Sequence, residues 1–216
     1  MRALKLAALG AAVAITGANA AFATEAGDWL VRAGVTDVVP KSNNGTIPAD
    51  GESPAIAVDV DDAVMLTFDG TYMVTDNFGV ELLAALPFKH DVYGKAAGEK
   101  VKLATVKQLP PTLSGVYRFN SQGTIQPYVG AGINWTLFFD EQEKGPLDDP
   151  SVNLKLDNSV GLAAVAGLDV FLTKTMFLNA NVRYMDIDSK VKVNGEKVLT
   201  AKVDPWIYAI NIGWQF

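Results

Sequence analysis

Apolar and polar residues alternate with a period of two along most of the chain. Near the C-terminus, every second residue from Trp206 to Phe216 is apolar, and the residues between them are mostly small or polar. This period places the two sets of side chains on opposite faces of a β-strand. The same pattern recurs along the chain and predicts about eight strands, within residues 29–35, 64–72, 78–88, 113–119, 127–139, 160–170, 176–184 and 206–216.

The connections between these strands alternate between short and long. Residues 75–77, 120–124 and 173–175 resemble tight turns, whereas residues 40–57, 91–100, 141–157 and 188–202 are longer and polar. Three short and four long connections fit an eight-stranded antiparallel barrel with both termini at its short-turn end. Asn194-Gly195 predicts a hairpin tip, so the last two strands should project beyond the membrane as a ribbon. Alternation continues through Asp69-Gly70, which predicts strand there, with or without a bulge.

The composition of the two faces separates a membrane barrel from a soluble sandwich. The polar face is rich in Gly, Ala, Ser and Asn, which suits the filled interior of a small barrel better than a solvated sheet face. Aromatic residues gather at or near strand ends, as in the girdles of membrane barrels. We therefore predict an all-β, eight-stranded antiparallel transmembrane β-barrel. The residues of its predicted girdles are Trp29, Tyr72, Phe78, Phe88, Tyr117, Phe119, Trp135, Phe139, Tyr184, Trp206, Trp214 and Phe216.

The N-terminal 23 residues have the features of a secretory signal peptide. Arg2 and Lys5 precede an apolar stretch, and Ala21-Phe22-Ala23 fits a cleavage site, with Ala20 as a second choice. A membrane anchor is the alternative, but the stretch is Ala- and Gly-rich and short for a spanning helix. We expect a signal peptide over residues 1–23 and a barrel with four extracellular loops over residues 24–216.

Composition excludes several classes of function. The chain has 216 residues, a formal charge of −6, one His and no Cys. An acidic chain without basic clusters is not expected to bind nucleic acid. The absence of cysteine excludes disulfides and thiolate chemistry, and a single histidine excludes multi-histidine metal sites, so we expect no cofactor.

The alternate residues that are expected to face the barrel interior include both charged and apolar ones. Buried charges of both signs must pair or stay hydrated, so they are expected to fill the lower lumen. The apolar residues predict either an upper funnel for apolar solutes or simple filling of a narrow barrel. The candidate channel-lining residues are Leu30, Arg32, Met65, Leu83, Lys89, Arg118, Phe138 and Arg183.

Prolines mark a candidate opening in the barrel wall. Pro87 and the pair Pro110-Pro111 lie near the outer ends of the third and fourth strands, and proline cannot donate to a strand ladder. They predict a lateral opening, or else only the end of regular pairing above the membrane.

Other candidate sites are weaker. His90 lies at the expected extracellular rim, but no accompanying nucleophile motif supports catalysis, so we predict that the chain is not an enzyme. Acidic residues in the loops could gather calcium or bridge to lipopolysaccharide through divalent ions, but they lack an EF-hand's spacing, and solvated charge is the simpler interpretation. These residues are Asp59, Asp61, Asp62, Asp148 and Asp149.

Four segments resemble the OmpW family of outer-membrane proteins. They are VELLAALPFKH at 80–90, LPPT at 109–112, QPYVGAG at 126–132 and the terminal WQF at 214–216. The resemblance implies a narrow barrel of the Gram-negative outer membrane, related to alkane-uptake proteins, that takes up small hydrophobic molecules and releases them laterally. It also implies lipid, lipopolysaccharide and the barrel-insertion machinery as partners, with Phe216 as the assembly signal. The alternative is a closed barrel whose loops serve adhesion, envelope stability or host interaction.

Overall fold

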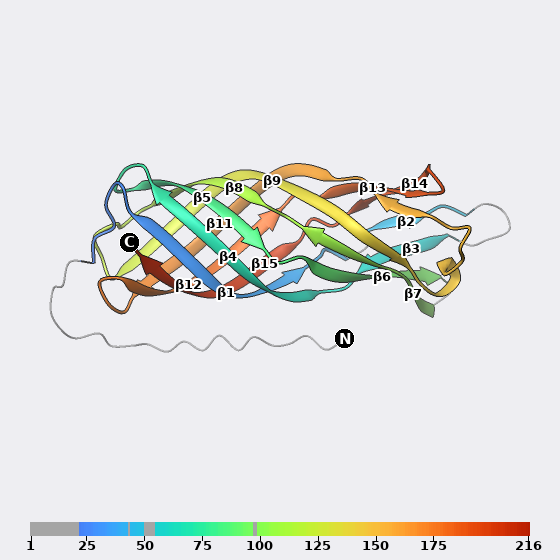
Figure 1. The fold of residues 1–216 in the computed structure, drawn as a ribbon, viewed down its shortest axis with the longest axis horizontal. Helices are drawn as coiled ribbons and strands as arrows, with labels where there is room; N and C mark the ends of the chain where they lie inside the picture. Colours follow the sequence, from blue (N-terminus) through green and yellow to red (C-terminus); the bar gives the residue numbers. More distant parts are fainter. Residues whose placement is uncertain (1–21, 43, 50–54, 97–98) are drawn as a thin grey trace.

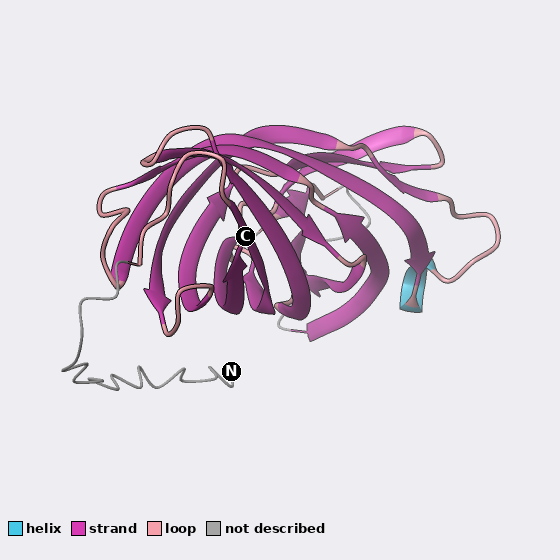
Figure 2. Ribbon diagram, turned by 60° about the vertical axis from the view of Figure 1, so that its left-hand side comes forward, coloured by secondary structure: helices cyan, strands magenta, loops and turns pink. Residues whose placement is uncertain are grey.

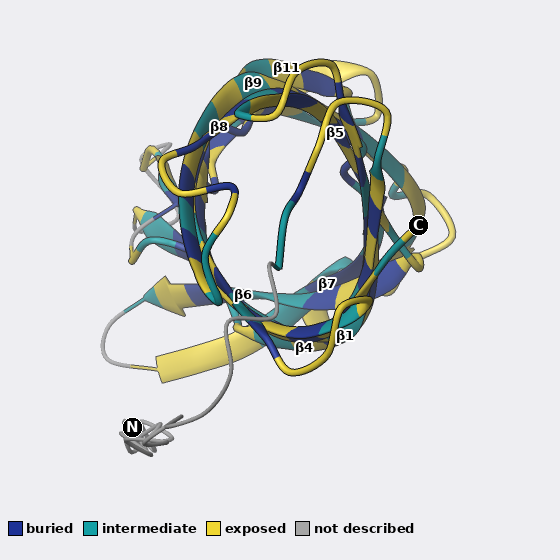
Figure 3. Cartoon of the chain, turned by 90° about the vertical axis from the view of Figure 1, so that its left-hand side faces the viewer, coloured by how far each residue is buried: buried dark blue, intermediate teal, exposed yellow. Residues whose placement is uncertain are grey.

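The computed structural model describes residues 22–42, 44–49, 55–96 and 99–216. Residues 1–21, which make up most of the predicted signal peptide, lie outside the described residues. Eight antiparallel strands pair in a ring that closes where β11 meets β9 (Figures 1 and 3). The eight-stranded prediction is confirmed. The ring strands are β1 (Trp29–Val39), β4 (Ala63–Met73), β5 (Phe78–Ala85), β8 (Thr112–Arg118), β9 (Ile125–Glu143), β11 (Ser159–Phe171), β12 (Met176–Met185) and β15 (Trp206–Gln215).

The two ends of the barrel differ, and we call them the turn end and the loop end. Short turns connect the strands at the turn end, where the C-terminus also lies (Figure 1). Strands and one short helix extend the wall at the loop end (Figure 2). These are β2 (Gly45–Ile47), β3 (Ile56–Val60), β6 (Phe88–Ala96), β7 (Glu99–Leu109), η1 (Gly145–Leu147), β10 (Leu154–Leu156), β13 (Asp188–Val193) and β14 (Glu196–Lys202). No helix in the described ranges is long and apolar enough to cross a membrane.

The prediction of long polar loops is therefore wrong over much of their length. Apolar residues recur at every second position there, as in Leu154 and Leu156 or Val191 and Val193, and this period forms strand. The predicted hairpin tip is confirmed, since Asn194 and Gly195 have φ of 52° and 86° between β13 and β14. Strand β4 runs through Asp69-Gly70 without a register shift, so it contains no bulge there.

The outward face is an apolar band with aromatic residues at both edges. Trp29 packs against Tyr72 at the turn end, and Tyr184 packs against Trp206 at the other edge. Strand β1 spans this band with 11 residues. At about 3.3 Å per residue and a tilt of about 40°, it covers about 25 Å along the barrel axis, the height of an outer-membrane apolar band.

The set of residues that faces the lumen changes from odd-numbered to even-numbered between β5 and β6. Glu81 and Leu83 are buried on β5, whereas Phe88 and His90 are buried on β6 and Lys89 between them is exposed. The predictions of a lumen-facing Lys89 and an outward-facing Phe88 are therefore wrong. The cause is the break at Leu86-Pro87 between the two strands, which inserts one residue into the alternation.

A closed ring predicts a specific behaviour on heating. The folded protein in detergent should give a β-rich circular dichroism spectrum, and unboiled samples should migrate differently from boiled ones. The reason is that every ring strand has a ladder partner on both sides, so the barrel unfolds cooperatively rather than from an edge. A helical spectrum, or identical migration before and after boiling, would contradict the closed barrel.

Candidate functional site

The barrel interior is arranged in layers along its axis. From the turn end to the loop end they are a polar plug, an apolar cluster, a group of ion pairs, a second apolar cluster and an apolar pocket. Each layer is formed by inward residues from several strands, because the ring brings every second side chain of each strand to the lumen.

The N-terminal part of the described chain closes the turn end. Residues 24–28 lie across the opening of the ring (Figure 3). The Thr24 hydroxyl donates to Gln126 Oε1 at 2.9 Å, and Gln215 Nε2 donates to Asp28 Oδ2 at 2.8 Å. Above this plug, four buried residues form an apolar cluster: Leu30, Met73, Phe171 and Phe177.

Six buried charged residues, which we call the charge cluster, fill the middle of the lumen. Arg32 Nη1 lies 2.6 Å from Asp69 Oδ1, and Arg32 Nη2 lies 2.9 Å from Asp169 Oδ2. Arg118 pairs with the same Asp169 oxygen. Arg183 Nη1 lies 2.7 Å from Glu81 Oε1. None of the six is more than 5% exposed, and their formal charges cancel.

The charge cluster closes the lumen to apolar solutes. The buried ring of Tyr128 fills the space beside it, with the Arg32 and Arg118 guanidinium carbons 5.3 and 5.4 Å from the ring centroid. An apolar molecule that moved along the axis would have to separate these ion pairs. Separating a buried pair costs about 3–5 kcal/mol because it leaves an uncompensated charge.

A second apolar cluster, which we call the constriction, lies between the charge cluster and the loop end. It consists of Val38, Met65, Leu83, Phe88, Ala163, Met185, Ile187, Val203 and Ile207, with Phe138 packed against it. The small cavity beside it measures about 20 Å³. That volume holds about one water molecule, so the constriction is closed to larger solutes in this conformation.

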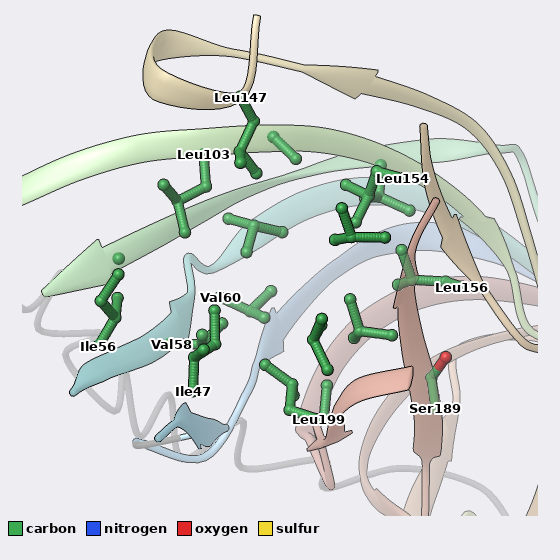
Figure 4. A pocket seen from close by; sticks show the side chains of 18 of the residues that line it. Ile47, Ile56, Val58, Val60, Leu103, Leu147, Leu154, Leu156, Ser189 and Leu199 are labelled. Atoms are coloured by element: carbon green, nitrogen blue, oxygen red, sulfur yellow. The ribbon is translucent and has the colours of Figure 1, made fainter. Parts of the chain in front are cut away.

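An apolar pocket of about 320 Å³ lies at the loop end. Its walls come from the loop-end strands, with Val58 of β3, Leu103 of β7, Leu156 of β10 and Leu199 of β14 directed into one space (Figure 4). The volume lies at the lower end of the range for small-molecule sites, roughly 300–1,000 Å³. We call this space the loop-end pocket.

His90 is a titratable residue in the wall of the loop-end pocket. It is buried, its ring meets Phe88 edge-on, and its Nδ1 lies 2.8 Å from the Asp61 carbonyl oxygen. Burial lowers the pKa of His90 more than the neighbouring Asp61, Asp62 and Asp91 raise it. The imidazole is therefore neutral at pH 7.

The strand ladder is interrupted on both sides of Leu86-Pro87. Towards β4, the ladder ends at Thr67↔Ala85 and resumes at Val60↔Val92. Towards β7 and β8, it ends at Leu83↔Thr112 and resumes at Phe88↔Gln108. Among the described residues, no ladder pair joins 62–66 to 86–90 or 84–87 to 109–111. We call these two stretches the ladder interruption.

The ladder interruption lies at the height of the loop-end aromatic girdle. The outward-facing Trp135 donates its amide to the Pro111 carbonyl at 2.9 Å. On the inside, Phe88 and Pro110 border the small cavity, and His90 and Gln108 border the loop-end pocket. The interruption thus lies between the inner apolar region and the membrane side of the wall.

The structure separates the predicted channel-lining residues into different layers. Phe138 lines the loop-end pocket, and Met65 and Leu83 lie in the constriction. Arg32, Arg118 and Arg183 belong to the charge cluster. Leu30 faces the lumen at the turn end, so the expectation that it contributes to an upper funnel is wrong: it lies at the opposite end of the chain's first strand from the pocket.

Most residues of the loop-end pocket lie in segments that sequence reasoning assigned to polar loops. The alternation of apolar residues in 154–156 and 189–193 is the signal that identifies them. Three of the five acidic loop residues are engaged with the protein: Asp59 pairs with Lys95, Asp61 with Lys100, and Asp149 accepts a hydrogen bond from Ser151. Asp186, Asp188 and Asp204 also lie together, but Lys202 and Lys41 pair with the latter two.

Comparison with known proteins agrees with this architecture. The OmpW family model matches residues 25–216. Outer membrane protein W of Escherichia coli (strain K12) is 38% identical over 227 residues, covering 100% of both chains. The crystal structure of outer membrane protein OprG from Pseudomonas aeruginosa superposes with a TM-score of 0.80 at 36% identity, covering 91% of this chain and 99% of OprG. Outer membrane protein AlkL, solved in lipid bilayers, gives a TM-score of 0.69 at 25% identity, covering 93% of each chain.

The charge cluster predicts a large effect of removing one carboxylate. Replacing Asp169→Asn leaves two buried guanidinium groups without a shared anion, and should lower the free energy of unfolding by about 3–5 kcal/mol. Urea titration in lipid vesicles, followed by tryptophan fluorescence, measures this change. The control is Asp157→Asn, which breaks a partly exposed pair with Lys192 and should cost less than about 1 kcal/mol. Equal effects of the two substitutions would contradict the structural role assigned to the charge cluster.

Proposed function

Because the chain belongs to the OmpW family, and is therefore a β-barrel of the Gram-negative outer membrane, we propose that it admits small hydrophobic molecules passively and releases them sideways into the membrane. One observation carries this proposal: an apolar pocket lies on the loop-end side of a lumen that is filled with ion pairs, beside an interruption of the strand ladder. OmpW-family proteins are non-enzymatic barrels, so the proposal concerns transport without chemical change.

The loop-end pocket supports the entry step. In outer-membrane barrels the short turns face the periplasm, so the loop end faces the outside. An apolar molecule that arrives from water would lose its contact with water against aliphatic side chains such as Val58, Leu156 and Leu199. Each square ångström of apolar surface buried in this way contributes about 25 cal/mol. The pocket therefore favours apolar solutes over polar ones.

The charge cluster directs the exit step. It makes the lumen below the constriction the most unfavourable part of the barrel for an apolar solute, because the ion pairs would be broken or stripped of their partners. The ladder interruption lies closer to the pocket, and apolar residues border it on the inside. A hydrophobic molecule would therefore leave through the wall between β4, β6 and β7 and enter the outer leaflet.

Proline makes such an opening compatible with a membrane. Pro87, Pro110 and Pro111 carry no backbone N–H, so they leave no donor unpaired at the interruption. Asn134 Nδ2 lies 3.3 Å from both the Pro110 and the Pro111 carbonyl oxygens and donates to them. This matters because an unsatisfied backbone group in hydrocarbon costs several kcal/mol.

A barrel that only presents its loops for adhesion or envelope stability is the alternative function. Its loop end would need binding surfaces but no apolar cavity, and no ladder interruption. Lipopolysaccharide, as a component of the surrounding leaflet, would remain a neighbour of the barrel under both functions.

Engineered disulfides test the lateral route. One disulfide joins Leu66→Cys to Leu86→Cys, the first positions beyond the last ladder pair Thr67↔Ala85. A second disulfide joins Ala84→Cys to Pro111→Cys, the first positions beyond the last ladder pair Leu83↔Thr112. The chain has no cysteine of its own. Closing the bridges should reduce uptake of nonane into proteoliposomes several-fold, and reduction should restore it.

Leu82→Cys with Leu113→Cys is the matched control, since these outward residues pair within an intact ladder. This bridge should leave uptake unchanged. If uptake persists when both test bridges are demonstrably closed, the lateral route is wrong.

We also propose that residues 1–23 are removed during export and that Phe216 is read by the barrel-insertion machinery. Phe216 is outward and exposed, and it exchanges two backbone hydrogen bonds with Trp29. Phe216→Asp should therefore strongly reduce the amount of heat-modifiable protein in the outer membrane. The control is Phe119→Asp, which places the same charge on another exposed aromatic position at the turn end. Equal losses for both variants would attribute the effect to the lipid-side charge alone.

A further inference from the structure

The wall of the loop-end pocket contains a hydrogen-bond acceptor without a partner. His90 is 4% exposed, and its Nε2 atom has no hydrogen-bond partner among the described residues. The other walls are almost entirely aliphatic, with Val92, Val106 and Val203 among the lining residues. Buried polar atoms in proteins are normally paired, so this nitrogen marks a position where a ligand group would be recognised.

The hydrogen-bonding state of Nε2 follows from its ring partner. Nδ1 lies 2.8 Å from the Asp61 carbonyl oxygen, which can only accept, so Nδ1 carries the ring hydrogen. A neutral imidazole has one N–H, and Nε2 therefore presents a lone pair. Burial keeps the pKa of His90 below its ordinary value, which maintains this neutral form. The pocket thus offers an acceptor, and a ligand that pairs with it must donate.

The remaining polar residues of the pocket do not replace this function. Glu99 lines the pocket, but its side chain is exposed and can be hydrated. Ser189 also lines the pocket, but its hydroxyl donates to the Asp157 carbonyl at 2.7 Å. Gln108 is buried beside His90 on the neighbouring strand, in register with Phe88. Its amide offers a donor and an acceptor together, and does not distinguish between ligands that donate and ligands that accept.

We infer that the preferred ligand of the loop-end pocket is an apolar molecule with a terminal hydroxyl group, which donates to His90 Nε2. This inference rests on the proposed uptake function and specifies its substrate class. Aliphatic alcohols meet the requirement, since the chain fills the aliphatic part of the pocket and the hydroxyl satisfies the buried nitrogen. Alkanes and ethers fit the same walls but leave Nε2 unpaired.

The test compares three probes of similar size: octan-1-ol, nonane and 1-methoxyheptane. Their dissociation constants are measured with the full mature protein in lipid nanodiscs. For each variant, the dissociation constant of the ether is divided by that of the alcohol. Each probe partitions into the lipid equally for all variants, so this contribution cancels when the ratios of two variants are compared. This ratio should be about 2- to 10-fold larger for the wild-type protein than for a variant without the acceptor. That range is expected for one neutral hydrogen bond.

Two substitutions separate the acceptor from the structural role of His90. His90→Asn retains an amide nitrogen near the place of Nδ1, which can still donate to Asp61, but removes the acceptor at Nε2. This variant should lose the preference for alcohol. His90→Gln places an amide oxygen near Nε2 and should recover part of it. Val106→Ala, which enlarges the same wall beside His90, should weaken all three probes equally.

Nuclear magnetic resonance gives a second readout that a purely structural role would not produce. His90 is the one histidine of the chain, so ¹⁵N-histidine labelling yields a single imidazole. Octan-1-ol should shift the Nε2 resonance, while nonane and the ether should not. If the probes bind but the alcohol preference and the shift are absent, the inference about His90 is wrong and uptake stands. If no probe binds, the uptake proposal fails as well.

Discussion

The need to satisfy every backbone polar group within hydrocarbon determines the architecture of this protein. A strand edge exposed to lipid would leave a row of unpaired N–H and C=O groups, so the sheet must close. Closure with eight strands leaves a lumen only wide enough for side chains. The barrel therefore cannot act as a wide aqueous pore, and its interior must be filled by residues that satisfy one another. The charge cluster, with three arginines and three carboxylates that pair within the ring, neutralises its own charges, although Glu81 Oε2, Arg118 Nε and Arg183 Nη2 have no hydrogen-bond partner among the described residues.

Filling the lumen with ion pairs moves the apolar binding space away from the membrane centre. Arginine and carboxylate groups can be buried only where partners surround them, and these partners occupy the space that a solute would need. Apolar side chains then form the layers on either side. Beyond the loop-end girdle, the longer strands such as β9, with 19 residues, extend the wall into water and shelter an apolar pocket there. The position of the pocket is thus a consequence of how the lumen below it is stabilised.

The sequence predicted those features that depend on a strict two-residue period. The ring strands, the girdle aromatics and the inward charges Arg32, Glu81 and Asp69 all follow from alternation along continuous strands. Prediction failed where that period is broken or weak. The break at Leu86-Pro87 reverses the faces of Phe88 and Lys89, and no pattern in the flanking residues shows on which side the extra residue falls. The loop-end strands were missed because charged residues such as Lys100 and Lys102 on their outer face resemble those of a solvated loop.

The break at Leu86-Pro87 also explains why the barrel wall is continuously paired along most of its length but unpaired at the ladder interruption. A one-residue insertion prevents β5 and β6 from continuing a single register with β7 and β8, so pairing must stop and restart. At mid-membrane such a break would expose donors to lipid. Here it lies beside Trp135, at the girdle, and three residues at the break, Pro87, Pro110 and Pro111, have no donor to expose. The Asn134 amide and the Trp135 backbone N–H then pair with the Pro110 and Pro111 carbonyls. An interruption of the ladder is therefore stable at this height and with these residues, whereas another residue at Pro110 or Pro111 would add an N–H that requires a partner.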